Sequence, residues 1–431
     1  MISDLFAART QMAVSLGFHI IFAAIGMAMP FLMAISHWRW LKTKDPVYLK
    51  LTKAWSQGVA VFFAVGAVSG TALSFELGLL WPKFMELAGP IIGMPFSWEG
   101  IAFFIEAIFI GVFLYGWNRI PSWTHWFSGL VVGISGVVSA FFVICANGWM
   151  NSPTGFDWVG GKALNIDPWA AMFNRAAFPQ GLHMALAAFT ATGFAVAGIH
   201  AIGLLRRPSD GFHRRAFQIA LLFGSVFALL IPLQGDRLAK RLESLQPAKL
   251  AAMEGLFKTS RSAPVILGGL PSEADHTVRY GIEIPGLLSF LTNGDFNSEV
   301  KGLDTVAREN WPPVAVTHLS FDLMVGIGTL LALVGVFSLF ASWKKPKWLA
   351  RPLFLKLIVF CLPLGFLAIE AGWTVTEVGR QPWIIYGFMK TQEAVTSTPG
   401  LFYTMVLFIV LYLFLSFMVT WLMIRRYGHV D

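Results

Sequence analysis

Nine apolar stretches, each long enough to cross a lipid bilayer, dominate this sequence. A helix needs about 20 apolar residues to span a bilayer, and inside lipid its backbone must satisfy its own hydrogen bonds. The sequence therefore predicts an all-α, polytopic membrane bundle of nine transmembrane helices. The stretches occupy residues 10–36, 54–80, 93–117, 124–147, 181–205, 216–234, 313–342, 353–373 and 400–424.

The composition supports the membrane assignment and excludes several other classes. Only 13% of the 431 residues are charged and 56% are hydrophobic, whereas soluble domains carry about 25% charged residues. The net charge of +8 does not predict a nucleic-acid partner, because the basic residues lie in loops between the spans. Cys145 and Cys361 both fall in apolar segments and form no disulfide framework or zinc pattern.

The charges of the short loops predict an orientation. The segments 37–53, 206–215 and 343–351 are rich in Lys and Arg, whereas the alternate segments 81–92 and 148–180 are poor in them. Cytoplasmic loops carry the excess of basic residues. We therefore expect the N-terminus outside and the C-terminus in the cytoplasm.

One loop is much longer than the others and divides the chain. Spans one to six occupy 1–234, a polar segment occupies 235–312, and spans seven to nine occupy 313–431. The predicted topology places the polar segment outside, and loops of this length are usually functional or disordered. A short helix is predicted after Pro247, and it would carry Lys249 and Glu254 close to one face. Taken alone, this pattern favours a surface helix over a functional one.

Two carboxylates stand inside an otherwise uncharged apolar stretch. Glu99 and Glu106 are seven residues apart, or two helical turns, so their side chains share one face. A carboxylate in hydrocarbon costs a few kcal/mol even on lenient scales. The pair predicts a site that handles protons, a cation or a cofactor; the alternative is a pair of structural carboxyls bonded to neighbouring helices.

Potential ligands for iron gather in the predicted outer half of the bundle. These are His19, His183, Met324 and Glu377, and haem is the cofactor that suits such residues within helices. A His/Met axial pair gives a six-coordinate haem of raised potential. Each residue also has a structural interpretation, because isolated His and Met side chains usually pack in the core. By residue type alone, His318 on the same span is the first choice of ligand, and composition does not select Met324 over it.

The order and content of several motifs resemble subunit I of the cytochrome bd-type quinol oxidases. The resemblance covers the whole chain, with nine spans and an external loop, called the Q-loop, after the sixth. The runs that carry it are Trp98-Glu99-Gly100, Phe103-Phe104-Ile105-Glu106, Gly116-Trp117, Ala146-Asn147-Gly148-Trp149-Met150-Asn151-Ser152-Pro153-Thr154-Gly155, Lys249-Leu250-Ala251-Ala252-Met253-Glu254, Met324-Val325-Gly326 and Gly379-Arg380-Gln381-Pro382-Trp383.

The resemblance implies roles for the candidate iron ligands. His183 and Met324 match the axial ligands of a low-spin haem b. His19 and Glu377 match the ligands of the two remaining haems, which reduce oxygen, and which haem each holds stays open. The resemblance also implies an environment for this haem pair, made of Glu99, Arg380, Trp373 and Asn147.

Proton and quinol sites follow from the same resemblance. Glu99, Glu106 and Ser139 match a proton path that leads inward. Lys249 and Glu254 match Q-loop positions tied to quinol oxidation. The implied function is a terminal oxidase that oxidises quinol outside and reduces O2 to water with cytoplasmic protons, which generates a proton motive force without pumping.

The family also implies cofactors, partners and a location. Two haems b are expected, one low-spin and one high-spin, together with haem d or a third haem b. The expected partners are subunit II and, in some members, a small single-span subunit. The expected location is the bacterial cytoplasmic (inner) membrane.

The chain departs from better-known members at a few positions. Asp322 stands where many carry an arginine, two residues before Met324, and Ser74 and Glu76 differ from a Glu/Gln pattern. These features and the short Q-loop resemble the cyanide-insensitive branch of the family, in which the haem d site can hold haem b.

Other function classes fit parts of the pattern. An ion-coupled secondary transporter would use Glu99 and Glu106 as its ion site, but no paired repeats are evident. A dihaem cytochrome b quinone reductase needs paired histidines on two helices, and only the span 181–205 carries two. A structural subunit without a redox centre would not explain the clustered outer-half ligands.

Overall fold

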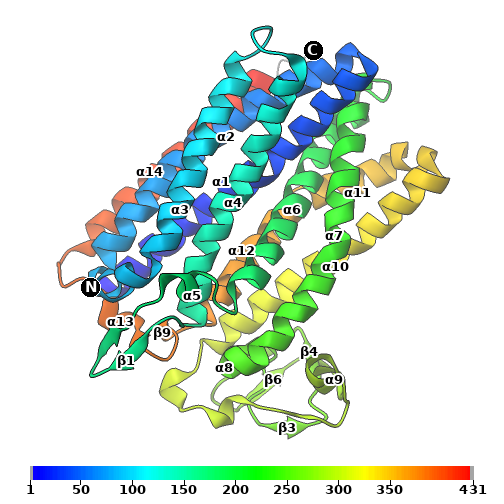
Figure 1. The fold of residues 1–431 in the computed structure, drawn as a ribbon. Helices are drawn as coiled ribbons and strands as arrows, with labels where there is room; N and C mark the ends of the chain where they lie inside the picture. The colour runs from blue at the N-terminus through cyan, green and yellow to red at the C-terminus, as the bar shows by residue number, and fades with distance from the viewer. Residues whose placement is uncertain (1–2, 428–431) are drawn as a thin grey trace.

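The computed structural model describes residues 3–427, and nine segments in that range are long and apolar enough to cross a membrane. The nine-span prediction is therefore confirmed. Figure 1 shows the long helices running side by side as one bundle. They are α1 (Asp4–Thr43), α2 (Pro46–Leu80), α3 (Pro82–Tyr115), α4 (Ser122–Asn151), α6 (Ala177–Arg206), α7 (Gly211–Leu245), α10 (Val314–Lys344), the pair α11 (Pro352–Cys361) and α12 (Leu364–Val378), and α14 (Leu401–Tyr427).

Local sequence explains where several of these helices begin. Ser3, Asp45 and Asp210 each accept a hydrogen bond from a backbone N–H of the first turn of α1, α2 and α7. Such caps satisfy donors that have no partner within the helix. Pro46 and Pro82 occupy the first turns of α2 and α3, where the missing N–H of proline costs nothing.

The helices are longer than the apolar stretches that predicted them. α7 continues through Leu245, past the expected end of span six at 234, and α3 begins at Pro82 rather than at 93. Hydropathy detects only the apolar part of a helix, so polar ends are missed. The eighth span is two helices, α11 and α12, which meet at Leu362 and Pro363, because proline cannot donate the hydrogen bond that would continue α11.

Close packing of α6 depends on glycine. A Cβ built on Gly193 would lie 2.5 Å from Gly224 Cα on α7, and one on Gly198 would lie 2.8 Å from Leu362 Cβ. The absence of a side chain at Gly193 and Gly198 thus lets α6 approach its neighbouring helices closely. Gly100 and Gly111 of α3 make no such contact, because an added Cβ at either position meets nothing within 4 Å in the described chain.

Short elements form a layer at one end of the bundle. Figure 1 shows this layer at the end where the N-terminus lies, with the C-terminus at the opposite end, as an odd number of spans requires. The strands pair as five two-stranded antiparallel sheets, β1–β2, β3–β8, β4–β7, β5–β6 and β9–β10. The elements are β1 (Asp157–Val159), β2 (Lys162–Leu164), α5 (Pro168–Met172), α8 (Pro247–Met253), β3 (Ser260–Arg261), β4 (Val265–Leu267), β5 (Leu270–Ser272), β6 (Thr277–Arg279), β7 (Ile282–Ile284), α9 (Leu287–Asn293), β8 (Glu299–Val300), β9 (Trp383–Ile385), β10 (Met389–Lys390) and α13 (Thr391–Ala394).

The long polar loop has its own hydrophobic cluster. Residues of α8 and α9 pack there with Leu256, Phe257 and Leu303, together with Val314 at the start of α10. Burial of these side chains offsets the entropy of ordering so long a connection. The loop is therefore folded, and the helix predicted after Pro247 is confirmed as α8.

Substitution of Gly193 tests the helix crossing. We expect Gly193→Val to lower the unfolding free energy by about 1–3 kcal/mol, because overpacking against the backbone of Gly224 cannot be relieved by side-chain rotation. The thermal unfolding midpoint of the purified complex measures this effect. Gly328→Ala on α10 is the control, since an added Cβ there meets nothing within 4 Å among the residues that the structure describes. An equal loss of stability in both variants would contradict the interpretation.

Candidate functional site

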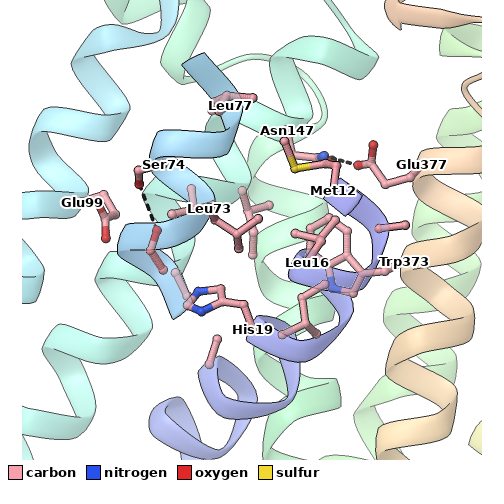
Figure 2. A pocket seen from close by; sticks show the side chains of 18 of the residues that line it. Met12, Leu16, His19, Leu73, Ser74, Leu77, Glu99, Asn147, Trp373 and Glu377 are labelled. Carbon is pink, nitrogen blue, oxygen red and sulfur yellow. Dashed lines mark hydrogen bonds between the residues drawn. The ribbon is translucent and has the colours of Figure 1, made fainter. Parts of the chain in front are cut away.

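A cavity of about 1050 Å³ lies among α1, α2, α3, α4 and α12. Its volume is at the upper end of the range for protein pockets that bind small molecules, about 300–1000 Å³. Figure 2 shows His19, Glu99, Asn147, Trp373 and Glu377 around this cavity, with Glu99 and Glu377 on opposite sides. The structure thus gathers most of the candidate residues in one place: His19, Glu99, Glu106, Ser139, Asn147, Trp373, Glu377 and Arg380 all line the cavity.

The imidazole of His19 is held by a serine of the neighbouring helix. His19 Nδ1 lies 2.9 Å from Ser69 Oγ, and the Ser69 hydroxyl donates to the backbone oxygen of Val65 at 2.9 Å. Because the Ser69 hydroxyl proton is donated to this backbone oxygen, Ser69 Oγ accepts a hydrogen bond from the N–H at His19 Nδ1. This arrangement leaves the lone pair on His19 Nε2, the atom that could bind a metal.

The two carboxylates of α3 both face the cavity, as their spacing predicted. Glu99 Oε1 accepts a hydrogen bond from Ser139 Oγ of α4 at 3.4 Å. Glu106 is buried, and a Cβ on Gly136 of α4 would lie 3.3 Å from its Oε1. Gly136 therefore leaves the space that the Glu106 carboxyl fills. Both carboxyls therefore lie on one wall of the cavity, two turns apart along α3.

Glu377 occupies the opposite wall with two polar partners. Asn147 Nδ2 donates to Glu377 Oε1 and Arg380 Nη2 donates to Glu377 Oε2, both at 2.5 Å. Arg380 is only 2% exposed, and its Nε and Nη1 atoms have no hydrogen-bond partner among the described residues. Burial lowers the pKa of Arg380, an effect that Glu377 opposes. Two buried guanidinium donors thus remain for an anionic group.

These features fit a haem. His19 Nε2 and the Glu377 carboxyl are axial-ligand types, and the free donors of Arg380 suit a haem propionate. No group of three or more His, Cys, Asp and Glu side chains that could hold a bare metal ion occurs among residues 3–427. A porphyrin needs only one or two protein ligands for its iron, so the residues present suit iron in a macrocycle.

His183 and Met324 do not line this cavity. His183 lies beside α7, and Met324 lies beside α12. A Cβ on Gly372 of α12 would lie 2.9 Å from Met324 Sδ, and one on Gly235 of α7 would lie 3.8 Å from His183 Cε1. His183 Nδ1 has no hydrogen-bond partner in the described chain. Their helices α6 and α10 both pack against α7 and α12. Trp373, which follows Gly372 directly, lines the large cavity, whereas Met324 does not.

Lys249 is buried rather than on a surface helix. Its ammonium donates to Asn151 Oδ1 at 2.7 Å and to the backbone oxygen of Thr376 at 3.1 Å, and the residue is 3% exposed. Burial lowers the pKa of Lys249 to about 7, with a smaller lowering from Arg380 and an opposing effect of Glu377. The interpretation of α8 as a surface helix was therefore wrong.

Glu254, at the end of α8, is also buried. Burial, together with the smaller effect of the nearby Asp322 carboxyl, raises the pKa of Glu254 to about 8. Burial thus shifts the pKa values of both Lys249 and Glu254 in the direction that favours the neutral form of each group. A base and an acid whose pKa values lie near neutral pH are suited to proton exchange.

His318 is a structural residue here. Its Nδ1 lies 2.7 Å from the backbone oxygen of Met253, and its Nε2 lies 3.0 Å from that of Gly268. Asp322 Oδ2 lies 3.4 Å from the same Nε2 and accepts a hydrogen bond from the N–H of Gly268 at 2.8 Å. His318 and Asp322 therefore fix the long loop to α10, and both nitrogens of His318 are occupied.

The other two departures from the family pattern have different surroundings. Glu76 is 1% exposed and accepts hydrogen bonds from Gln11 at 3.1 Å and Ser15 at 2.9 Å. It does not line the cavity, so its carboxyl belongs to the contact between α1 and α2. Ser74 lines the cavity and donates to the backbone oxygen of Gly70 at 3.1 Å.

Sequence reasoning missed two polar residues of the site. Ser69 gave no signal, because its partner His19 lies on another helix. Asn151 stands four residues after Asn147, which places both on one face of α4, and this spacing was available in the sequence. The structure shows Asn151 bonded to both Asn147 and Lys249.

Comparison with known proteins gives one consistent family. The family model for cytochrome bd terminal oxidase subunit I matches residues 7–430. A Bacillus subtilis protein named "Putative cytochrome bd menaquinol oxidase subunit I" is 37% identical over 92% of this chain and 90% of that protein. The Bacillus subtilis cytochrome bd ubiquinol oxidase subunit 1 is 31% identical over 98% and 93%.

A solved structure agrees with these relatives. The bd oxidase from Geobacillus thermodenitrificans has a chain that matches this one with a TM-score of 0.94 at 38% identity, over 99% of both chains. The all-α, nine-helix fold expected from the sequence is therefore that of a bd oxidase subunit.

The raised pKa of Glu254 predicts a pH dependence of stability. A group whose pKa is higher in the folded state contributes full stability below its ordinary value of 4.5 and loses it as the pH rises through about 8. We expect Glu254→Gln to remove this loss, so that the variant gains on the order of 3 kcal/mol relative to wild type between pH 5 and pH 9. Thermal unfolding midpoints across that range measure the difference.

Lys249 provides the control for sign, because its pKa is lowered and its contribution rises with pH above about 7. Lys249→Met should therefore remove a rise rather than a loss. Parallel curves for wild type and Glu254→Gln would contradict the burial of an ionisable carboxyl.

Proposed function

This chain belongs to the cytochrome bd oxidase subunit I family, and we propose that it oxidises quinol at the outer face of the membrane and reduces O2 to water with protons from the cytoplasm. As a family member it is a subunit of a terminal respiratory oxidase and a multi-pass bacterial membrane protein. The ion-coupled transporter considered from the sequence gains no support from these relatives.

The single observation that carries the proposal is the lining of the large cavity. Candidate iron ligands, carboxyls and a buried guanidinium come from helices far apart in the sequence and share one space of about 1050 Å³. A lipid-embedded bundle retains such costly groups only where a bound group or a reaction uses them. Haem, the cofactor class of this family, matches the ligand types present.

His19 and Glu377 would hold the cavity haems, with Arg380 at the propionates and Asn147 and Trp373 beside them. His183 and Met324, which do not line the cavity, would hold the low-spin haem b. Bound haem would supply the redox-active iron that takes electrons from quinol and passes them to oxygen. Two haems b, with haem d or a third haem b, complete the proposed set.

Quinol oxidation is assigned to the folded loop at the end of the bundle. Loss of two electrons from a quinol releases two protons, so the site needs groups that exchange protons near neutral pH. Lys249 and Glu254 meet this need, because burial brings both pKa values close to 7–8. We place this loop on the outer face, following the distribution of basic residues in the short loops.

Protons for water formation are assigned to the carboxyls of α3. Glu106, in the space left by Gly136, would pass protons toward Glu99, which Ser139 holds at 3.4 Å. Protons taken from the cytoplasm and released outside would generate a proton motive force without a pump. The proposed setting is the cytoplasmic (inner) membrane, in a complex with subunit II and, in some members, a small single-span subunit.

Substitution at the low-spin haem site tests the cofactor assignment. We expect His183→Ala or Met324→Leu to abolish the low-spin haem b bands in the reduced-minus-oxidised spectrum, because each removes one axial ligand. Met405→Leu is the matched control, since Met405 is buried in an apolar cluster. Low-spin bands that survive in either ligand variant would reject the assignment.

A further inference from the structure

A continuous run of hydrogen bonds connects α8 of the loop to the cavity. Lys249 Nζ donates to Asn151 Oδ1 at 2.7 Å, Asn151 Nδ2 donates to Asn147 Oδ1 at 3.1 Å, and Asn147 Nδ2 donates to Glu377 Oε1 at 2.5 Å. The run begins at a buried ammonium and ends at a carboxyl on the cavity wall. It spans three segments that are far apart in the sequence.

Every bond in the run has the same direction. Each donor points to an acceptor that lies closer to Glu377 along the run, so the amide dipoles of Asn151 and Asn147 align between Lys249 and Glu377. Aligned hydrogen bonds in a medium of low dielectric polarise and strengthen one another. A carboxamide holds no proton that it exchanges readily near neutral pH, so the run transmits position and electrostatic potential rather than protons.

Asn151 is the residue on which the connection depends. It is 3% exposed, and its amide group bonds Lys249 on one side and Asn147 on the other. In the described chain, the other hydrogen-bond partner of the Lys249 ammonium is the backbone oxygen of Thr376. Removal of the Asn151 amide would therefore leave a buried ammonium short of one partner, which is costly.

We propose that Asn151 is a positioning residue that couples the quinol loop to the carboxyl of Glu377 at the oxygen-reducing cavity. The proposal rests on the function proposed above. Asn151 thus fixes both the position of the Lys249 ammonium at the quinol site and the orientation of the Asn147 amide at the haem site. A change in the position of Lys249 therefore alters the surroundings of Glu377, and the reverse also holds, with no need for a ligand that contacts both residues.

Substitutions of Asn151 separate its two contacts. Asn151→Leu keeps the approximate volume and removes both the acceptor for Lys249 and the donor to Asn147. Asn151→Asp keeps an acceptor for Lys249 and removes the N–H that Asn147 receives. Ser135→Ala on the same helix is the matched control, because within residues 3–427 the buried Ser135 hydroxyl donates only to backbone oxygens of α4.

The test uses the complete purified complex with its partner subunit. Two readouts are taken: the KM and kcat for a soluble quinol, and the carbon monoxide difference spectrum and midpoint potentials of the haems. We expect Asn151→Leu to raise KM about 10-fold, the effect of losing about one charge-assisted hydrogen bond, and to shift the spectrum and potential of a cavity haem. Asn151→Asp should leave KM within about 3-fold and still shift the spectrum. Ser135→Ala should change neither.

Defined outcomes would overturn the proposal. If Asn151→Leu raises KM while the haem signature is unchanged, Asn151 serves the loop alone. If it shifts the signature while KM is unchanged, Asn151 serves the cavity alone. If Asn151→Leu does not assemble, the spectrum of Asn151→Asp decides, and an unchanged spectrum defeats the coupling. Failure of the proposed function is distinct, because the wild-type complex itself would then lack haem or quinol-dependent oxygen uptake.

Discussion

The satisfaction of polar groups away from water is the constraint on which this structure depends. Lipid supplies no hydrogen bonds, so each buried polar side chain must find a partner within the bundle or serve a bound group. Glu99, Glu377 and Lys249 find theirs on other helices. The two unpartnered nitrogens of Arg380 are an exception in the described chain, and they point to the cofactor that the family carries.

The same constraint joins the loop to the membrane bundle. α8 buries Lys249 against α4 and α12, while His318 and Asp322 of α10 bond the backbone of the loop. The loop also contributes its own hydrophobic cluster, which includes Val314 of α10. The loop is therefore packed as part of the bundle, and hydrogen bonds connect the proposed quinol site to the cavity.

Much of the fold and part of the site could be predicted from residues alone. Spans were found because hydropathy needs no tertiary information, and the seven-residue spacing of Glu99 and Glu106 correctly placed both on one face of α3. The choice between Met324 and His318 could not be made this way, because it depends on backbone oxygens of a distant loop. Ser69 was missed for the same reason, since its importance arises from contact with another helix.

The number of spans, the helical class and the residue types available for chemistry follow from local composition and periodicity, so they can be read from the residues alone. Which side chains meet depends on tertiary packing. It buried α8, opened the space beside Gly136 for Glu106, and aligned Asn151 between Lys249 and Asn147. Those outcomes depend on how helices far apart in the chain pack, and no local pattern encodes that packing.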